Sequence, residues 1–165
     1  MSFEALVADA EQVAALLKAR HQSIAVAESS TGGLISAALL AVPGASSYYY
    51  GGGVVYTPRA RHRLLDLKRE EVRGLRSASE PYALALAERT RTRFKTSWAI
   101  GETGASGPSG NPYGDAAGHC CLAVHGPGGA VARTLETGRT DRLGNMYAFA
   151  AAAFELLRRQ IEGQP

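Results

Sequence analysis

The apolar run SIAVA at 23–27 most constrains how this chain can fold, because it lies between two stretches with helical spacing. The run is short and rich in β-branched residues, as expected of a buried strand. Before it, apolar residues recur at helical spacing from Phe3 to Arg20, and after it a second helix is expected from about Thr31 to Ala41. This order predicts the beginning of a layered α/β domain.

The alternation of helices and apolar strands continues beyond these elements. Further helices are expected over 58–65, 79–94 and 141–161, and further strands over 48–56, 96–103, 119–124 and 130–137. The last two strands are joined by HGPGG, which indicates an antiparallel pair. We therefore predict a three-layer α/β/α sandwich with a mixed, mostly parallel sheet of about five or six strands. Neither a repeat nor a linker divides the chain, so residues 1–165 are expected to form one domain.

Composition and charge narrow the class of partner. The net charge of +3 comes from fifteen arginines and three lysines, but the arginines alternate along the expected helices instead of forming one basic stripe. A solvated surface is thus favoured over a nucleic-acid partner. The apolar stretch 34–42 is too short to cross a bilayer, and Glu4 and Asp9 interrupt what would have to be an export signal. We expect a cytoplasmic protein without a membrane partner.

Three loops follow the ends of expected strands: ESSTGG at 28–33, TPRARH at 57–62 and GASGPSGNPYGDAAG at 104–118. In α/β sheets, ligands collect at the carboxyl ends of the strands, where such loops meet. The third loop contains five glycines and two prolines, and loops of this length are usually functional or disordered. The three loops together are the candidate site.

The first loop places Ser29 and Ser30 at the start of a helix. Free N–H groups there favour an anion or a developing oxyanion, and Gly32 and Gly33 would allow a ligand to approach closely. The alternative is that one serine only caps the helix. Glu28, at the end of the strand, either pairs with an arginine or orients the serine, and an ion pair is the commoner outcome.

A metal site is not expected. His62, His119 and His125 have no metal-ligand spacing with the two cysteines, Cys120 and Cys121, whose side chains point to opposite faces of one strand. Neighbouring cysteines also rarely form a disulfide. We therefore expect neither a metal nor a disulfide, and nothing in the sequence indicates another cofactor.

Five motifs, in order along nearly the whole chain, closely resemble those of the CinA C-terminal domain family, whose enzyme members are nicotinamide-nucleotide amidases. They are AESSTGG at 27–33, PGASSYYYGGGVVYTPRARHRLL at 43–65, ASEP at 78–81, TGASGPSGNPYGDAAG at 103–118 and TDR at 140–142. The resemblance implies hydrolysis of the carboxamide of nicotinamide mononucleotide to nicotinate mononucleotide and ammonia, without a metal or cofactor.

The resemblance also assigns positions in the site. The family's nucleophile falls on Ser29, its helper tyrosine on Tyr56 and its lysine, the presumed base, on position 61. The substrate pocket is expected to involve Glu28, Ser30, Thr31, Gly32, Gly33, Thr103, Gly104 and Arg142.

Position 61 departs from the family, because Arg61 replaces the lysine. A guanidinium has a pKa above about 12 and cannot serve as a base, although it can hold a phosphate. His119 and His62 are the alternative bases. The long loop also departs, with Asp115 to Gly118 in place of a Lys-Pro-Val-Gly stretch.

Three interpretations of function follow. The preferred one is an amidohydrolase on a pyridine nucleotide with another base. The second is a nucleotide-binding relative without turnover, in which Arg61 grips a phosphate. The third is a binding module that presents the tyrosines at 48–50 to a partner, although sheet packing and a contact between subunits of a homo-oligomer explain these tyrosines more simply.

Overall fold

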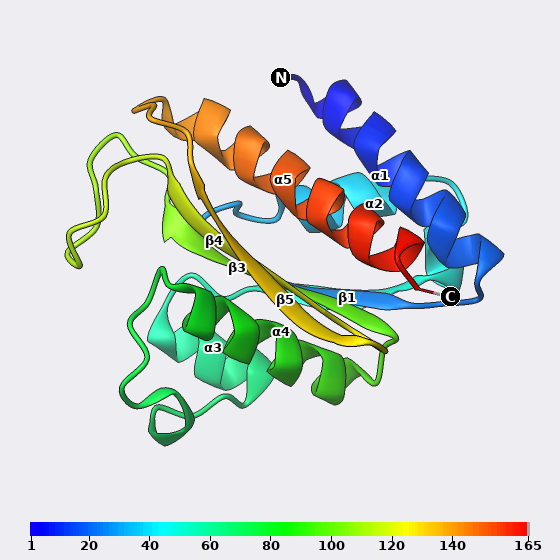
Figure 1. The fold of residues 1–165 in the computed structure, drawn as a ribbon, viewed down its shortest axis with the longest axis horizontal. Coiled ribbons are helices and arrows are strands. Elements are labelled where there is room, and N and C mark those ends of the chain that lie inside the picture. The colour runs from blue at the N-terminus through cyan, green and yellow to red at the C-terminus, as the bar shows by residue number, and fades with distance from the viewer. Residues whose placement is uncertain (165) are drawn as a thin grey trace.

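A five-stranded sheet separates two layers of helices in the computed structural model, which describes residues 1–164 (Figure 1). The strands are β1 (Ile24–Glu28), β2 (Tyr49–Val54), β3 (Trp98–Ala105), β4 (His119–Gly126) and β5 (Gly129–Glu136). The helices are α1 (Phe3–Ala19), α2 (Leu34–Ala41), α3 (Pro58–Leu65), α4 (Glu80–Phe94) and α5 (Arg142–Glu162), with short 3-10 turns η1 (Ala45–Ser47) and η2 (Glu70–Val72).

The sheet has the strand order β2-β1-β3-β4-β5. β1 pairs in parallel with β2 and β3, while β4 pairs antiparallel with both β3 and β5, so that four strands run one way and β4 runs against them. The predicted three-layer sandwich and its mixed, mostly parallel sheet are confirmed. The carboxyl ends of β1, β2 and β3 lie at one edge of the sheet, where the three candidate loops begin.

Helices cover both faces of the sheet. α1, α2 and α5 pack on one face around the larger apolar cluster, and α3 and α4 pack on the other (Figure 1). Burial on both faces explains why all five residues of β1 are buried. No helix within residues 1–164 is both long and apolar enough to cross a membrane.

Local sequence features set the helix ends where they were expected. The Ser2 hydroxyl accepts the N–H of Ala5, and the Ser79 hydroxyl accepts the N–H of Tyr82 at 3.4 Å. Gly101 lets α4 approach β3, because a Cβ at this position would collide with the carbonyl oxygen of Ala83. This close packing holds α4 beside the carboxyl end of β3.

Two sequence expectations are corrected at this level. The helix after β1 begins at Leu34 rather than Thr31, because residues 29–33 form a turn in which Gly32 and Gly33 have φ of 64° and 101°. Arg61 is buried rather than solvated, because the segment after α3 folds over its guanidinium.

The tyrosines at 48–50, around the start of β2, differ in burial. Tyr48 is fully buried and its hydroxyl donates to the carbonyl of Leu39, whereas Tyr50 is 57% exposed. Packing is therefore confirmed for Tyr48. Cys120 and Cys121 are both free and buried.

Candidate active site

A cleft lies at the edge of the sheet between the turn 29–33, the segment after β2 and the long loop 104–118. It has two adjoining hollows of about 270 Å³ and about 240 Å³, which share Tyr56, Gly104, Asn111 and Pro112 in their walls. Ser29 and Thr103 line the first hollow, and Ser30 and Arg142 line the second. The structure thus brings together six of the residues that the sequence predicts for the site.

Ser29 has a fixed backbone and a free hydroxyl. Its N–H donates to Oε2 of Glu102 at 2.8 Å, while its hydroxyl makes no hydrogen bond within residues 1–164. The residue is half-buried and faces the first hollow. Its hydroxyl is therefore accessible to a ligand and is held in place through the main chain.

Glu102, on β3, holds this turn from inside the protein. Its fully buried carboxylate accepts the N–H groups of Ser29, Ser30 and Thr31 at 2.8, 3.2 and 2.9 Å. It also accepts the hydroxyl of Ser30, and the Thr31 hydroxyl lies 2.8 Å away. Glu102 is not among the site residues predicted from sequence. The sequence feature that could have indicated it is a lone carboxylate within the otherwise uncharged strand WAIGETGA.

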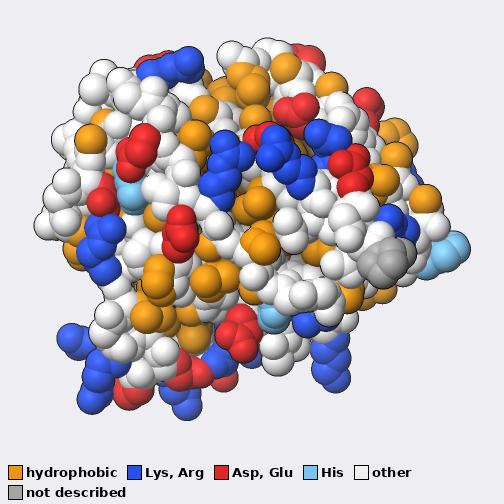
Figure 2. Space-filling model, in the orientation of Figure 1, with side chains coloured by type: hydrophobic (Ala, Val, Ile, Leu, Met, Phe, Trp, Pro, Cys, Tyr) orange, Lys and Arg blue, Asp and Glu red, His pale blue; other side chains and the backbone are white. Residues whose placement is uncertain are grey.

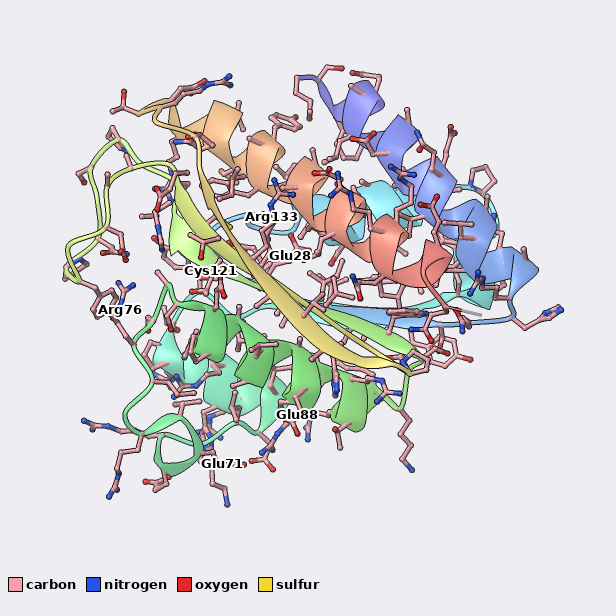
Figure 3. The ribbon with its side chains drawn as sticks, viewed as in Figure 1. Glu28, Glu71, Arg76, Glu88, Cys121 and Arg133 are labelled. Carbon is pink, nitrogen blue, oxygen red and sulfur yellow. The ribbon has the colours of Figure 1, made fainter. Side chains whose placement is uncertain are left out.

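Glu28 holds the first turn of α2 in the same way. Its fully buried carboxylate accepts the N–H groups of Gly33, Ile35 and Ser36 at 3.0, 3.1 and 2.8 Å, and the hydroxyl of Ser36 at 2.6 Å. The expected ion pair with an arginine is not formed by any described residue, because donors at the helix start take its place. Figure 3 shows Glu28 in the interior of the molecule.

These bonds correct the expectation that N–H groups after β1 are free for an anion. Protein carboxylates occupy those of Ser29, Ser30, Thr31 and Gly33, and the N–H of Gly32 donates to the carbonyl of Ser29 at 3.2 Å. Thr31 is fully buried, and none of Thr31, Gly32 and Gly33 borders either hollow.

Tyr56, Thr103 and Gly104 form the part of the wall that faces Ser29. Tyr56 is 61% exposed and borders both hollows. The Thr103 hydroxyl accepts the N–H of Ala78 at 3.2 Å. A Cβ at Gly104 would lie 2.5 Å from the carbonyl oxygen of His119, so only glycine leaves this strand packing intact.

Arg142 and the glycine-rich loop form the far end of the cleft. Arg142, at the start of α5, donates to the carbonyl of Gly107 at 2.6 Å. Gly107, Ser109 and Gly110 line the second hollow, and their N–H groups donate to no described residue. Anions are commonly bound by such groups of backbone N–H donors beside a guanidinium.

Asn145 fixes this loop. Its fully buried amide donates to the carbonyls of Ser106 and Arg139, both at 2.8 Å, and accepts the hydroxyl of Thr137 at 2.6 Å. At the other end of the loop, Asp115 pairs with Arg76, which reaches toward the loop from the segment before α4 (Figure 3).

Arg61 and His62 lie outside the cleft. Arg61 is 5% exposed and donates to the carbonyl of Leu67 at 3.2 Å and to the hydroxyl of Tyr82 at 2.9 Å. Tyr82 does border the cleft, so Arg61 contacts its wall from behind. His62 is exposed on α3 and borders a different cavity with Arg61.

His119 lies outside the cleft as well, with both ring nitrogens engaged. Nδ1 contacts the carboxylate of Glu136, and Nε2 lies 2.9 Å from the carbonyl of Ala78. Burial alone lowers the pKa of His119, but these two bonds, together with the negative charges of Glu136 and Asp115, raise that pKa above its usual value. In this arrangement His119 has no free nitrogen to accept a proton from Ser29. Within residues 1–164, no group of three or more His, Cys, Asp or Glu side chains is placed to hold a metal ion.

Solved structures share this fold. A CinA superfamily protein from Klebsiella pneumoniae matches 99% of this chain and 100% of its own with a TM-score of 0.89 and 24% identity. The competence/damage inducible protein CihA from Agrobacterium tumefaciens matches 95% of each chain with a TM-score of 0.86 and 26% identity. The first likeness concerns the fold alone.

Sequence relatives extend the likeness. A CinA-like protein from Anaeromyxobacter sp. (strain K) is 41% identical over 143 residues, which are 86% of this chain and 35% of that protein. Another, from Parasynechococcus marenigrum (strain WH8102), is 37% identical over 94% of this chain and 37% of its own length. The chain thus spans about a third of the length of the curated relatives it matches. The model of the CinA C-terminal domain matches residues 7–161, and the chain belongs to this family.

Proposed function

We propose that this protein hydrolyses the carboxamide of a pyridine mononucleotide such as nicotinamide mononucleotide, with Ser29 as nucleophile. One observation carries the proposal: the Ser29 hydroxyl is unengaged at the wall of the cleft while its N–H is fixed by Glu102. A nucleophile held by its main chain, with its reactive atom free, suits attack on a bound carbonyl. Family membership is consistent with a hydrolase.

The two hollows suit the two ends of such a substrate. The carboxamide would occupy the first hollow beside Ser29 and Tyr56, whose walls are hydroxyl-lined and carry no lysine, histidine, aspartate or glutamate among the described residues. The phosphate would occupy the second, where Arg142 and the N–H groups of Gly107, Ser109 and Gly110 offer donors.

Tyr56 is the residue to which we assign proton transfer. As the Ser29 oxygen bonds to the carbonyl carbon, its proton would pass to the Tyr56 oxygen, and the Tyr56 proton would pass to the nitrogen that leaves as ammonia. Water then cleaves the acyl-serine to give the carboxylic acid and restores Ser29. This relay needs no lysine or histidine as a separate base, and the described walls of the two hollows contain neither.

Incubation with nicotinamide mononucleotide, followed by assay of ammonia and nicotinate mononucleotide, tests the proposal. We expect turnover in the native chain and a loss of at least about a thousandfold in Ser29→Ala. Ser46→Ala is the control, since Ser46 is an exposed serine on η1 that borders neither hollow, and it should keep the native rate. Equal rates in Ser29→Ala and the native chain would show that Ser29 is not the nucleophile.

The second candidate is a nucleotide-binding protein without turnover. The observation that favours it is the absence of the family's lysine: Arg61 stands there and is directed to Leu67 and Tyr82 behind the cleft wall. Saturable binding of nicotinamide mononucleotide, weakened by Arg142→Gln and unaccompanied by ammonia, would select this candidate over the first.

A further inference from the structure

A second cavity, of about 860 Å³, lies beside the cleft, between α3 and the segment that leads to α4. We call it the basic cavity; its wall comprises Pro58, Arg59, Arg61, His62, Lys68, Arg69, Glu70, Val72, Arg73, Gly74, Leu75 and Tyr113. Figure 2 shows Lys and Arg side chains gathered at the lower left of the molecule, over the segment that joins α3 to α4. The cavity has the volume of an ordinary small-molecule site.

The charge of this wall is strongly positive. Five lysine and arginine side chains line it, against the single carboxylate of Glu70. None of the five forms an ion pair with any residue in the described part of the chain, so no described carboxylate neutralises this group of charges. The wall's excess of four positive charges exceeds the +3 of the whole chain.

Among these cations, Arg61 is the strongest indication of an anionic ligand, because it is only 5% exposed. Its acceptors are neutral, the Leu67 carbonyl and the Tyr82 hydroxyl, and Nη2 has no acceptor within residues 1–164. A buried charge without a counter-ion is unfavourable, and an anion bound in the cavity would supply that counter-ion. The four exposed cations of the wall, Arg59, Lys68, Arg69 and Arg73, form what we call the rim. Buried Arg61 and this rim both indicate an anionic ligand.

We propose that the basic cavity binds a nucleoside diphosphate, with its phosphates at Arg61, Arg69 and Arg73. One guanidinium can donate two parallel hydrogen bonds to two oxygens of the same phosphate, which makes these arginines suitable phosphate ligands. The apolar part of the wall, formed by Val72, Leu75 and Tyr113, accommodates the base. This site is separate from the Ser29 cleft, which it adjoins at Pro58 and Tyr113, and it does not depend on the proposed function.

Calorimetric titration of the whole chain with ADP, inorganic pyrophosphate and adenosine, at low salt, tests this site. We expect ADP to bind more tightly than pyrophosphate, and pyrophosphate more tightly than adenosine. Arg69→Gln/Arg73→Gln removes two exposed arginines of the rim, and the loss of their charge-assisted bonds is expected to weaken ADP binding at least about tenfold.

The control is Arg63→Gln/Arg139→Gln, which removes the same charge from two exposed arginines outside the basic cavity. It is expected to bind ADP within about twofold of the native chain. Arg142→Gln, in the Ser29 cleft, should likewise leave ADP binding unchanged. The site is overturned if ADP does not bind, if the rim variant binds it as tightly as the native chain, or if Arg142→Gln abolishes binding. ADP binding no tighter than pyrophosphate would overturn the placement of a base against Leu75.

Discussion

Charge is buried without an ion pair on both sides of the segment that joins β2 to α3, but many more hydrogen bonds satisfy it on one side than on the other. Beneath the Ser29 turn, the carboxylates of Glu28 and Glu102 accept N–H and O–H donors from the turn itself. In the basic cavity, the Arg61 guanidinium donates only to neutral oxygens and faces further cations. Several donors satisfy each carboxylate of the first region, whereas Arg61 donates two hydrogen bonds and its Nη2 has no acceptor among the described residues.

This difference separates the kinds of ligand that the two regions suit. The donors that commonly bind phosphate at a helix start are occupied in the Ser29 turn, so the first hollow suits an uncharged group such as a carboxamide. The basic cavity has donors without acceptors and suits an anion. Two nearby cavities can thus differ in ligand because of how their buried charges are satisfied.

The largest effect on stability is expected when the hydrogen bonds to the Glu102 carboxylate beneath the Ser29 turn are broken. Glu102→Gln keeps the shape but directs an amide NH₂ at donor groups, which should destabilise the protein by about 3 kcal/mol. Urea unfolding would measure this loss. Glu88→Gln is the control, because Glu88 is exposed on α4 (Figure 3) and forms no ion pair in the described chain. Equal unfolding free energies for the two variants would contradict the role given to Glu102.

A smaller effect is expected from salt. Several rim arginines are exposed, so ADP binding to the basic cavity should weaken roughly tenfold between about 0.05 and about 0.5 M NaCl. If nicotinamide mononucleotide binds in the Ser29 cleft as proposed, Arg142 would be the one cationic side chain in the described wall, and binding should weaken by less than about threefold. Calorimetry at several salt concentrations measures how each binding affinity depends on salt. An identical dependence for the two ligands would contradict the difference in charge between the two cavities.

The smallest effect concerns His119, which contacts Glu136 across β4 and β5. Because the folded state raises its pKa, the pair stabilises the protein fully below the ordinary histidine pKa of about 6.5, and the contribution is lost as pH rises through the higher folded value. Glu136 is 59% exposed on its side chain, so we expect at most about 1 kcal/mol. The difference in unfolding free energy between the native chain and Glu136→Gln should shrink with rising pH; a constant difference would argue against a charged pair.

Periodicity and capping residues predict most of this fold. The helices start near Ser2 and Ser79 as their sequences indicate, and the hairpin follows from HGPGG. Local signals succeed here because these bonds join residues that are close in the chain.

The inside of the site is harder to predict. The bond between Ser29 and Glu102 joins residues 73 positions apart, and it depends on the parallel register of β1 and β3. Glu28 takes backbone donors where an arginine was expected, and Arg61 is buried by a segment without regular spacing. The Glu102 and Arg61 contacts depend on tertiary packing, for which a local pattern contains no signal, whereas the donors of Glu28 are near it in the chain. The cytoplasmic location and the homo-oligomer stay predictions.

The bonds to Glu102 have a consequence for how selectivity can change among related chains. A turn whose N–H groups already have partners gains no hydrogen bond to its main chain by changing conformation, so we expect it to act as a rigid template for a ligand. Differences in ligand among related chains would then arise from the loop 104–118. This loop borders both hollows and has N–H groups without partners in the described chain. Grafting this loop between relatives is therefore the most direct way to exchange their ligands without disturbing Ser29.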